Sequence, residues 1–385
     1  MRHKKLGIIL LPLFVAALNI MIIIFPRESL AAARGGLMLW SHNVLPGILP
    51  FVIGANLLMA LGGAGFIGEL LSPITRAVFR VPGRGGFALA IGLISGYPVG
   101  TKVVCEMRSQ GHLTKIEAQR LVAFTSNAGP LFVLGAVAAG MFGSASLGYF
   151  MLAAHYLGAL SVGLIMRFYK TRYDKIPNKD AEMPLHIKAF RAMEATRQAD
   201  SRSFGLILGA CIKDAVETML IIGGFVVLFS VVSAILELSG VFYALSSFLE
   251  FFGMFHVEHL SGFIEMTNGV SALSAQGISL QVVAACVAII SFGGLSILFQ
   301  SINFIAKTDI SIAIFVLCKM AHGAISGLFS IILFPLFSSS FESVEFVAVH
   351  SPGFVRSSAN FILMVAGLLV ICMGVLVIGH IRKSR

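Results

Sequence analysis

The sequence predicts an all-α polytopic membrane protein built from two inverted-topology repeats. Of the 385 residues, 57% are hydrophobic and only 12% are charged, whereas soluble proteins carry about 25% charged residues. Apolar stretches long enough to cross a bilayer, about 20 residues each, recur along the chain. A motif that begins at Ala154-His155 nearly recurs at Ala321-His322, inside another apolar stretch. Doubled patterns with helix-breaking residues are typical of transporter folds.

The chain begins with a basic pentapeptide, which is followed by an apolar stretch over residues 6–25. This arrangement resembles a signal peptide, and Ala31-Ala32-Ala33 could mark a cleavage site. The apolar stretch is longer than a typical signal-peptide core, so an uncleaved first membrane span is favoured.

Eight apolar stretches are interpreted as transmembrane helices. They run over residues 6–25, 44–64, 121–141, 148–168, 212–238, 282–306, 310–336 and 359–379. Two further apolar stretches, 86–104 and 260–280, carry turn-forming residues at their centres, and we expect re-entrant hairpins there.

Lysine and arginine gather in five stretches that this assignment places on one side of the membrane. The five are the N-terminus, 65–84, 102–120, 169–203 and the C-terminus. The positive-inside rule makes that side cytoplasmic. The opposite stretches 239–258 and 338–358 carry one basic residue, Arg356, and the segment 26–36 fits least well. We therefore expect both termini in the cytoplasm.

The order of crossings gives the two repeats opposite orientations. The first repeat, 37–168, starts outside and ends inside, whereas the second, 204–337, starts inside and ends outside. A first helix with an outer linker (1–36), a basic and partly helical cytoplasmic linker (169–203), and an outer loop with a C-terminal helix (338–385) complete the chain. Inverted repeats underlie alternating access in many secondary transporters.

The first hairpin is interrupted between Gly92 and Lys102 by glycines and Pro98. A helix cannot continue cleanly through this stretch, so its free N–H groups suit an anionic or strongly polar ligand. The candidate substrate-binding side chains are Ser95, Tyr97, Thr101 and Lys102. The alternative is a cytoplasmic turn between two ordinary spans.

The second hairpin carries Glu265, Thr267 and Asn268 in the matching stretch. An intramembrane carboxylate is a functional candidate as a proton carrier, a cation ligand or a hydrogen-bond acceptor. The alternative is a structural partner for a buried lysine or histidine.

Each repeat then contains a span that is broken by polar and small residues, at Phe124–Pro130 and at Ser291–Ser296. Half-helix ends at such breaks can face a substrate from both sides. Ser126, Asn127 and Ser291 are the candidate substrate-binding residues here. Helix packing alone is the alternative role for these small residues.

Lys319 lies near the middle of a predicted span, one turn before His322. A lysine at mid-bilayer costs about 2.5–3.5 kcal/mol on insertion scales. We therefore expect it to face a polar cavity, to bind substrate or to pair with Glu265, with snorkelling to the interface as the alternative. His155 and His322 occupy equivalent repeat positions, and we expect interhelical hydrogen bonds from them.

Several other functions find little support. The net charge of +10 is explained by basic loops, and no aromatic-rich basic domain indicates nucleic-acid binding. The five scattered cysteines include no C-x-x-C pair, so neither a disulfide framework nor a metal site is expected. Gly63–Gly68 fits a dinucleotide-binding pattern but follows a membrane helix, and His256–His259 lacks the spacing of a zinc protease. No catalytic constellation is visible, so we expect no enzyme and no cofactor.

Four segments together resemble one known family over nearly the whole chain. They are Arg80–Gly83, Gly92–Lys102, Ala118–Asn127 and Ala153–Gly158. The chain resembles the YlbJ, or SpoVV, family of sporulation integral membrane proteins, and the Ser-Gly-Tyr-Pro-x-Gly-x-Lys segment is the most specific match.

This resemblance carries functional implications of its own. It implies nucleoside-recognition Gate domains and an organisation similar to that of concentrative nucleoside transporters. It also implies a location in the outer forespore membrane of a spore-forming bacterium, and export of dipicolinic acid from the mother cell toward the forespore.

The leading hypothesis is therefore a transporter of a small organic anion, dipicolinate, in the lipid bilayer. A transporter of nucleosides or similar polar metabolites and a non-transporting scaffold for spore envelope assembly are the alternatives. Coupling to H⁺, to Na⁺ or to no cation stays open, as does a homo-oligomer.

Overall fold

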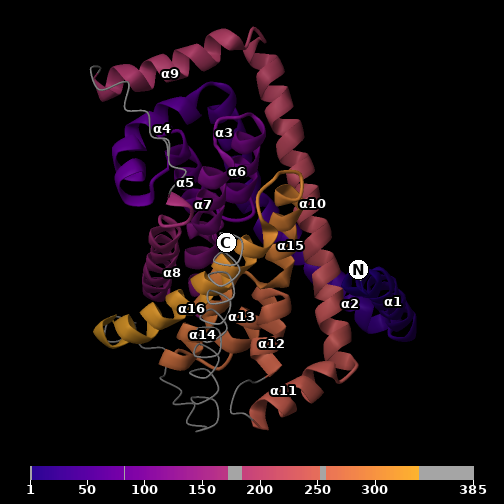
Figure 1. Ribbon diagram of the computed structural model, residues 1–385. Helices are drawn as coiled ribbons and strands as arrows, with labels where there is room; N and C mark the ends of the chain where they lie inside the picture. Colours follow the sequence, from indigo (N-terminus) through magenta and orange to yellow (C-terminus); the bar gives the residue numbers. More distant parts are fainter. Residues whose placement is uncertain (1, 82, 172–183, 252–256, 338–385) are drawn as a thin grey trace.

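A computed structural model describes residues 2–81, 83–171, 184–251 and 257–337, and every regular element in these ranges is a helix (Figure 1). The elements of the first part are α1 (Arg2–Ile24), α2 (Pro26–Leu39), η1 (Trp40–Val44), α3 (Leu45–Ala60), α4 (Gly63–Ile74), η2 (Thr75–Phe79), α5 (Gly85–Ile94), α6 (Val99–Ser109), α7 (Lys115–Thr125), η3 (Leu131–Met141) and α8 (Ala145–Met166). Those of the second part are α9 (Leu185–Ala199), α10 (Phe204–Leu238), α11 (Val241–Phe251), α12 (Val257–Ile264), α13 (Met266–Ser274), α14 (Leu280–Phe292), α15 (Gly294–Ile305) and α16 (Ile312–Phe337).

Four helical stretches are long and apolar enough to cross a bilayer within the described residues. They are α8, α10, the α14–α15 pair and α16, and two bent pairs raise the number to six if each pair forms one span. The described part of the chain is therefore all-helical, with the lengths and composition of a membrane protein. The predicted outer loop 338–358 and the predicted span 359–379 lie outside the described residues.

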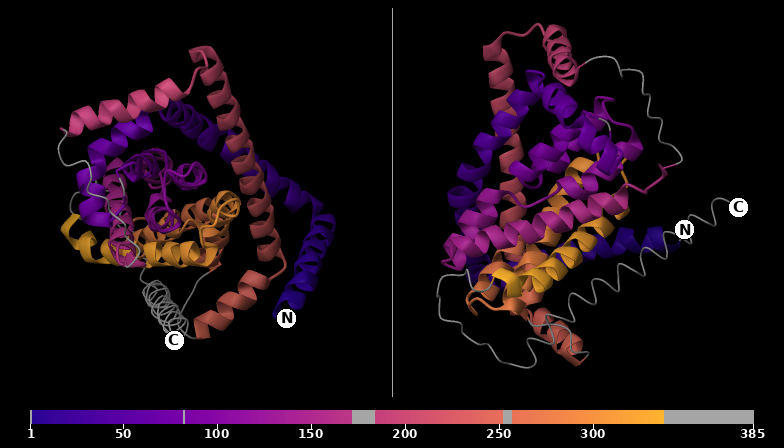
Figure 2. Two further views of the ribbon diagram at one scale, coloured as in Figure 1. Left: turned by 45° about the horizontal axis from the view of Figure 1, so that its top comes forward. Right: turned by 90° about the vertical axis from the view of Figure 1, so that its left-hand side faces the viewer.

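The N-terminal region differs from the prediction in one respect. Helix α1 covers the predicted span 6–25, but the predicted outer linker 26–36 is part of helix α2. Pro26 occupies the first turn of α2, where a proline is tolerated because that N–H has no helical partner. The two helices meet at 104°. Helix α2 packs along α10, whereas α1 extends away from the body (Figures 1 and 2).

Helix α3 covers most of the predicted span 44–64, but it ends at Ala60, and the chain then turns into α4. Gly62 allows this turn with a φ of +85°, a backbone conformation that favours glycine. The linker is partly helical as expected, since α9 lies within it and packs on α4.

The two halves of the chain repeat one order of elements. In the first half, α3 and α4 precede the hairpin α5–α6, the broken helix α7–η3 and the long helix α8. In the second half, α10 and α11 precede the hairpin α12–α13, the broken helix α14–α15 and the long helix α16. Both predicted hairpins are thus interrupted at their predicted centres, between α5 and α6 and at Glu265.

Contacts between the halves are reciprocal. Helices α8 and α16 pack on each other at the centre, α7 packs on α16, and α14 packs on α8. At the crossing of α8 and α16, Gly158 faces Ser326 so closely that an added Cβ would lie 3.1 Å from the Ser326 Cα. The doubled sequence motif therefore marks the helix–helix crossing that joins the halves.

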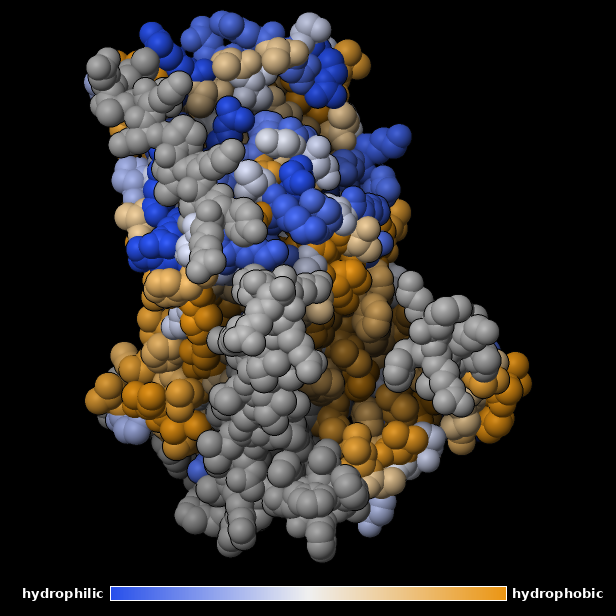
Figure 3. Space-filling model, viewed as in Figure 1, coloured by the Kyte–Doolittle hydropathy of each residue, from blue (hydrophilic) through white to orange (hydrophobic). Residues whose placement is uncertain are grey.

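Surface hydropathy divides the molecule into two regions (Figure 3). In this view hydrophilic residues gather over the part that includes α4 and α9, and hydrophobic residues dominate the opposite part. Large apolar side chains such as Leu206, Leu220 and Leu228 are exposed along α10, as expected for a helix that faces lipid. Helix α14 is buried inside the protein instead.

Candidate functional site

The tip of the first hairpin is held against the broken helix of the same half. Between α5 and α6, the backbone N–H of Tyr97 donates to the carbonyl oxygen of Asn127 at 2.5 Å. Gly96 has a φ of +78°, and a Cβ added to it would lie 2.5 Å from the Gly129 nitrogen. A glycine is therefore required for this close approach.

The break in the first broken helix exposes polar groups to the interior. Helix α7 begins with a capping box at Thr114 and ends at Thr125, and non-helical backbone follows before Pro130 starts the next helical turn. The Asn127 side chain donates to the Phe124 carbonyl at 2.8 Å. By contrast, Ser126 Oγ and Asn127 Oδ1 are buried and have no hydrogen-bond partner within the described ranges. Such groups are costly unless a ligand or water satisfies them.

The second hairpin meets the second broken helix in the same way. Glu265 is the N-cap of α13, and its carboxylate accepts the backbone N–H of Asn268 at 2.8 Å. A negative charge at a helix N-terminus is favourable. Gly294 lies beside this tip, and a Cβ added to it would be 3.1 Å from the Met266 nitrogen. Glu265 therefore has a structural role as a cap.

The two hairpin tips touch each other through Tyr97. Its hydroxyl donates to the Met266 sulfur at 2.6 Å and lies 3.4 Å from the Ile290 carbonyl oxygen. Tyr97 comes from the first hairpin, Met266 begins the second helix of the second hairpin, and Ile290 lies in the second broken helix. Because the Tyr97 N–H also bonds to Asn127 in the first broken helix, four interrupted elements meet at this point.

Lys319 brings a buried amino group to the same point. Its Nζ donates to the Ser126 carbonyl oxygen at 2.7 Å, lies 3.4 Å from His322 Nδ1, and sits 5.7 Å from the centre of the Tyr97 ring. The side chain is fully buried. The expected pairing with Glu265 is wrong, because the Glu265 carboxylate caps α13 and Lys319 is held by these other groups instead.

The two repeated histidines hold the halves together. The Nε2 atom of His155 accepts the Ala128 N–H at 2.9 Å, so Nδ1 carries the hydrogen and donates to Ser291 Oγ at 2.7 Å. His322 Nε2 donates to the His155 carbonyl oxygen at 3.0 Å, which leaves its Nδ1 as the acceptor for Lys319. The expected interhelical hydrogen bonds of both histidines are confirmed.

The structure brings some of the predicted site residues together and places the others elsewhere. Tyr97, Ser126, Asn127 and Lys319 lie together, and Ser291 joins them through His155. Lys102 points elsewhere, the Asn268 side chain is exposed, and the remaining predicted residues are buried near the hairpin tips: Ser95, Thr101, Glu265 and Thr267.

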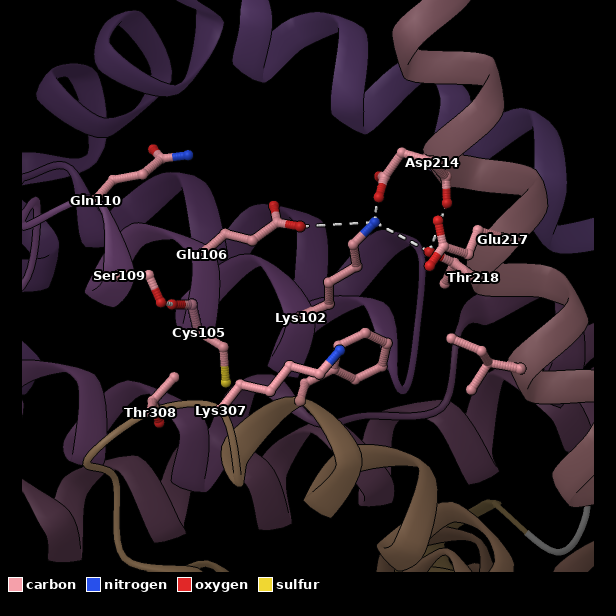
Figure 4. A pocket seen from close by; sticks show the side chains of 12 residues that line it. Lys102, Cys105, Glu106, Ser109, Gln110, Asp214, Glu217, Thr218, Lys307 and Thr308 are labelled. Carbon is pink, nitrogen blue, oxygen red and sulfur yellow. Dashed lines mark hydrogen bonds and ion pairs between the residues drawn. The ribbon is translucent and has the colours of Figure 1, made fainter.

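Lys102 belongs to a second polar cluster, which lines a cavity of about 240 Å³ between α6, α10 and the end of α15 (Figure 4). Its ammonium pairs with Asp214, lies 3.6 Å from Glu106 and donates to Thr218 at 3.0 Å. Asn56 on α3 donates to the same Asp214 oxygen at 2.7 Å. This cluster therefore ties the first hairpin to α10 and α3.

Asp214 was not among the predicted residues. It lies two residues inside the predicted span 212–238, and a carboxylate in an apolar stretch is a recognisable signal. At the rim of the same region, the Arg108 guanidinium makes two hydrogen bonds of 2.9 Å to Asp309. These bonds lower the pKa of the Asp309 carboxyl.

Comparison with known proteins gives a family. The chain is 36% identical over 358 residues to the sporulation integral membrane protein YlbJ of Bacillus subtilis (strain 168), and the match covers 90% of this chain and 88% of the relative. The chain belongs to the YlbJ family of sporulation integral membrane proteins. No family model and no solved structure matches it. The resemblance to this family that the sequence predicts is thereby confirmed.

Proposed function

We propose that the protein is a membrane transporter that moves a small organic anion by alternating access, and that the anion is dipicolinate. The observation that carries this proposal is the convergence at Lys319. The fully buried amino group of Lys319 bonds to the Ser126 carbonyl oxygen in a broken helix, next to the hairpin tip of Tyr97. Two buried polar atoms of the same break, Ser126 Oγ and Asn127 Oδ1, have no hydrogen-bond partner among the described residues. Paired discontinuous helices of this kind form substrate sites in transporters.

The repeated element order supports alternating access. Two halves with the same order of elements, joined through a crossing of equivalent helices, are what inverted-topology repeats produce. The basic stretches on the side of α4 and α9 support a cytoplasmic location for that side, and in our proposal both termini lie in the cytoplasm. In this arrangement one half can rock against the other about α8 and α16.

The choice of dipicolinate rests on the family and on charge. A relative that is a sporulation integral membrane protein supports a role in spore formation, and the family resemblance supports export from the mother cell across the outer forespore membrane. Dipicolinate is a small aromatic dianion. A buried ammonium can bind its carboxylate, and a neighbouring tyrosine ring can contact its ring face.

Efflux from proteoliposomes tests this proposal. Purified full-length protein is reconstituted into vesicles that are loaded with radiolabelled dipicolinate, and we expect efflux well above that of empty vesicles. Lys319→Ala and Asn127→Ala should abolish it at unchanged protein levels, whereas Lys115→Ala, at an exposed lysine on α7, should not change it.

Two other results would redirect the proposal. In the first, nucleosides inhibit dipicolinate flux more strongly than benzoate-type anions do, and this result would indicate a transporter of nucleosides. Equal flux with and without the protein, together with normal spores from the Lys319→Ala and Asn127→Ala strains, would favour the scaffold.

A further inference from the structure

Lys319 has two hydrogen-bond acceptors among the residues that the structure describes. They are the Ser126 carbonyl oxygen at 2.7 Å and His322 Nδ1 at 3.4 Å, and the centre of the Tyr97 ring lies 5.7 Å from the same nitrogen. An ammonium group has three N–H donors, whereas a neutral amine has two. The two acceptors beside Lys319 therefore match the two N–H donors of the neutral amine.

No carboxylate within 4.0 Å balances a charge on Lys319 among the residues that the structure describes. The titratable groups on the neighbouring elements are all engaged or uncharged. His155 on α8 is bonded to Ala128 and Ser291, and Arg120 on α7 donates to the carbonyls of Tyr169 and Arg80. Cys318, beside Lys319, and Cys286 on α14 carry buried thiols, and Glu265 caps α13. An isolated ammonium in such a place is strongly disfavoured.

An anionic substrate would supply Lys319 with a further hydrogen-bond acceptor and a negative charge. One of its carboxylates offers the third acceptor and a counter-charge, and the unpartnered Ser126 hydroxyl can donate to the same group. Binding of the anion would therefore favour protonation of Lys319, and protonation of Lys319 would equally favour binding of the anion.

From this we infer that the transporter is coupled to protons through Lys319: the amine takes up a proton as the anion binds and gives it up as the anion leaves. The inference rests on the proposed function. The proton forms an N–H bond on entry, that bond breaks on release, and the proton crosses the membrane in the same direction as the anion. Lys319 thus carries the coupling ion, and the site needs no sodium ion.

Proton movement in proteoliposomes tests the inference. Vesicles contain purified full-length protein and a trapped pH-sensitive dye, and valinomycin with potassium clamps the membrane potential. A dipicolinate gradient should move about one proton with each anion, as binding linkage requires, and replacing sodium by choline should change neither flux. Dipicolinate flux without a pH change would overturn the inference and leave the proposed function standing. Absence of any flux would refute the proposed function and the inference with it.

Two variants locate the coupling. Lys319→Arg keeps a positive charge that does not lose its proton, so we expect anion binding with at least a tenfold loss of proton flux per anion. Glu265→Gln should keep proton coupling within about twofold, because Glu265 serves as a helix cap. Lost coupling in Glu265→Gln with retained coupling in Lys319→Arg would overturn the assignment. If Lys319→Arg does not fold, the wild-type proton measurement still decides.

Discussion

Alanine substitution of the two buried serines at the helix breaks should affect two different properties, stability in one case and transport in the other. Ser291 and Ser126 are both almost fully buried. The Ser291 hydroxyl accepts a hydrogen bond of 2.7 Å from His155 Nδ1, whereas the Ser126 hydroxyl has no hydrogen-bond partner in the described part of the chain. Ser291→Ala should therefore weaken the fold, and Ser126→Ala should weaken transport.

The magnitudes follow from the hydrogen bonds. Removing the Ser291 hydroxyl leaves a buried imidazole N–H without an acceptor, which costs about 1–3 kcal/mol of unfolding free energy. Removing the Ser126 hydroxyl breaks no protein hydrogen bond, so the unfolding free energy should stay within about 0.5 kcal/mol. If that hydroxyl donates to a substrate carboxylate, its loss costs about 1.5–3 kcal/mol of binding, roughly a tenfold to hundredfold loss of affinity.

The assay pairs stability with transport for both variants. Unfolding free energies come from titration of detergent-solubilised protein with sodium dodecyl sulfate, followed by circular dichroism, and dipicolinate efflux is measured in vesicles that contain equal amounts of protein. An equal loss of stability in both variants would refute the hydrogen-bond assignment. Normal efflux in Ser126→Ala would remove that residue from the substrate site.

Three further substitutions, with Gly224→Ala as a control, probe the scaffold. Asp214→Asn removes the charge that pairs with the buried Lys102. In the same titration the unfolding free energy should fall by about 1.5–3 kcal/mol. An unchanged unfolding free energy would show that the pair does not stabilise the fold. Gly158→Ala forces α8 away from α16 and should cost about 1–3 kcal/mol, whereas Gly224→Ala, which meets nothing within 4 Å, should not destabilise. The hydrogen bonds from Arg108 lower the pKa of Asp309. Above a pH of about 4 this ion pair should therefore stabilise the fold by at most about 1 kcal/mol. The stabilisation should disappear as the pH falls through the lowered pKa. Asp309→Asn should therefore flatten the acid limb of the stability curve, and an unchanged acid limb would contradict this account.

Much of the fold follows from local sequence. The apolar lengths predicted α1, α8 and α16 to within a few residues, apart from the basic start of α1, because burial in lipid requires such lengths. Glycine and proline clusters predicted both hairpins, since these residues interrupt helices wherever they fall. The bend after α3 was missed because Gly62 lies among apolar residues that alone predict a continuous span. Helix α2 was missed because its hydrophobic stripe is short and interrupted by charges.

Site residues were predictable as types but not as partners. Lys319 and the broken-helix residues are conspicuous because polar groups in apolar stretches are costly. Their partners depend on how distant helices cross, so Lys319 meets Ser126 and His322 rather than Glu265. The same limit explains why Lys102, adjacent in sequence to the hairpin tip, pairs with Asp214 on α10.

Counterflow through the purified protein tests the central claim most directly. Vesicles that contain the protein and a high concentration of unlabelled dipicolinate are diluted into a trace of labelled dipicolinate. An alternating-access carrier predicts transient accumulation of label above equilibrium, with loss of that accumulation in Lys319→Ala. Label that never exceeds equilibrium, from protein shown to be folded, would contradict the assignment of this chain as a dipicolinate carrier.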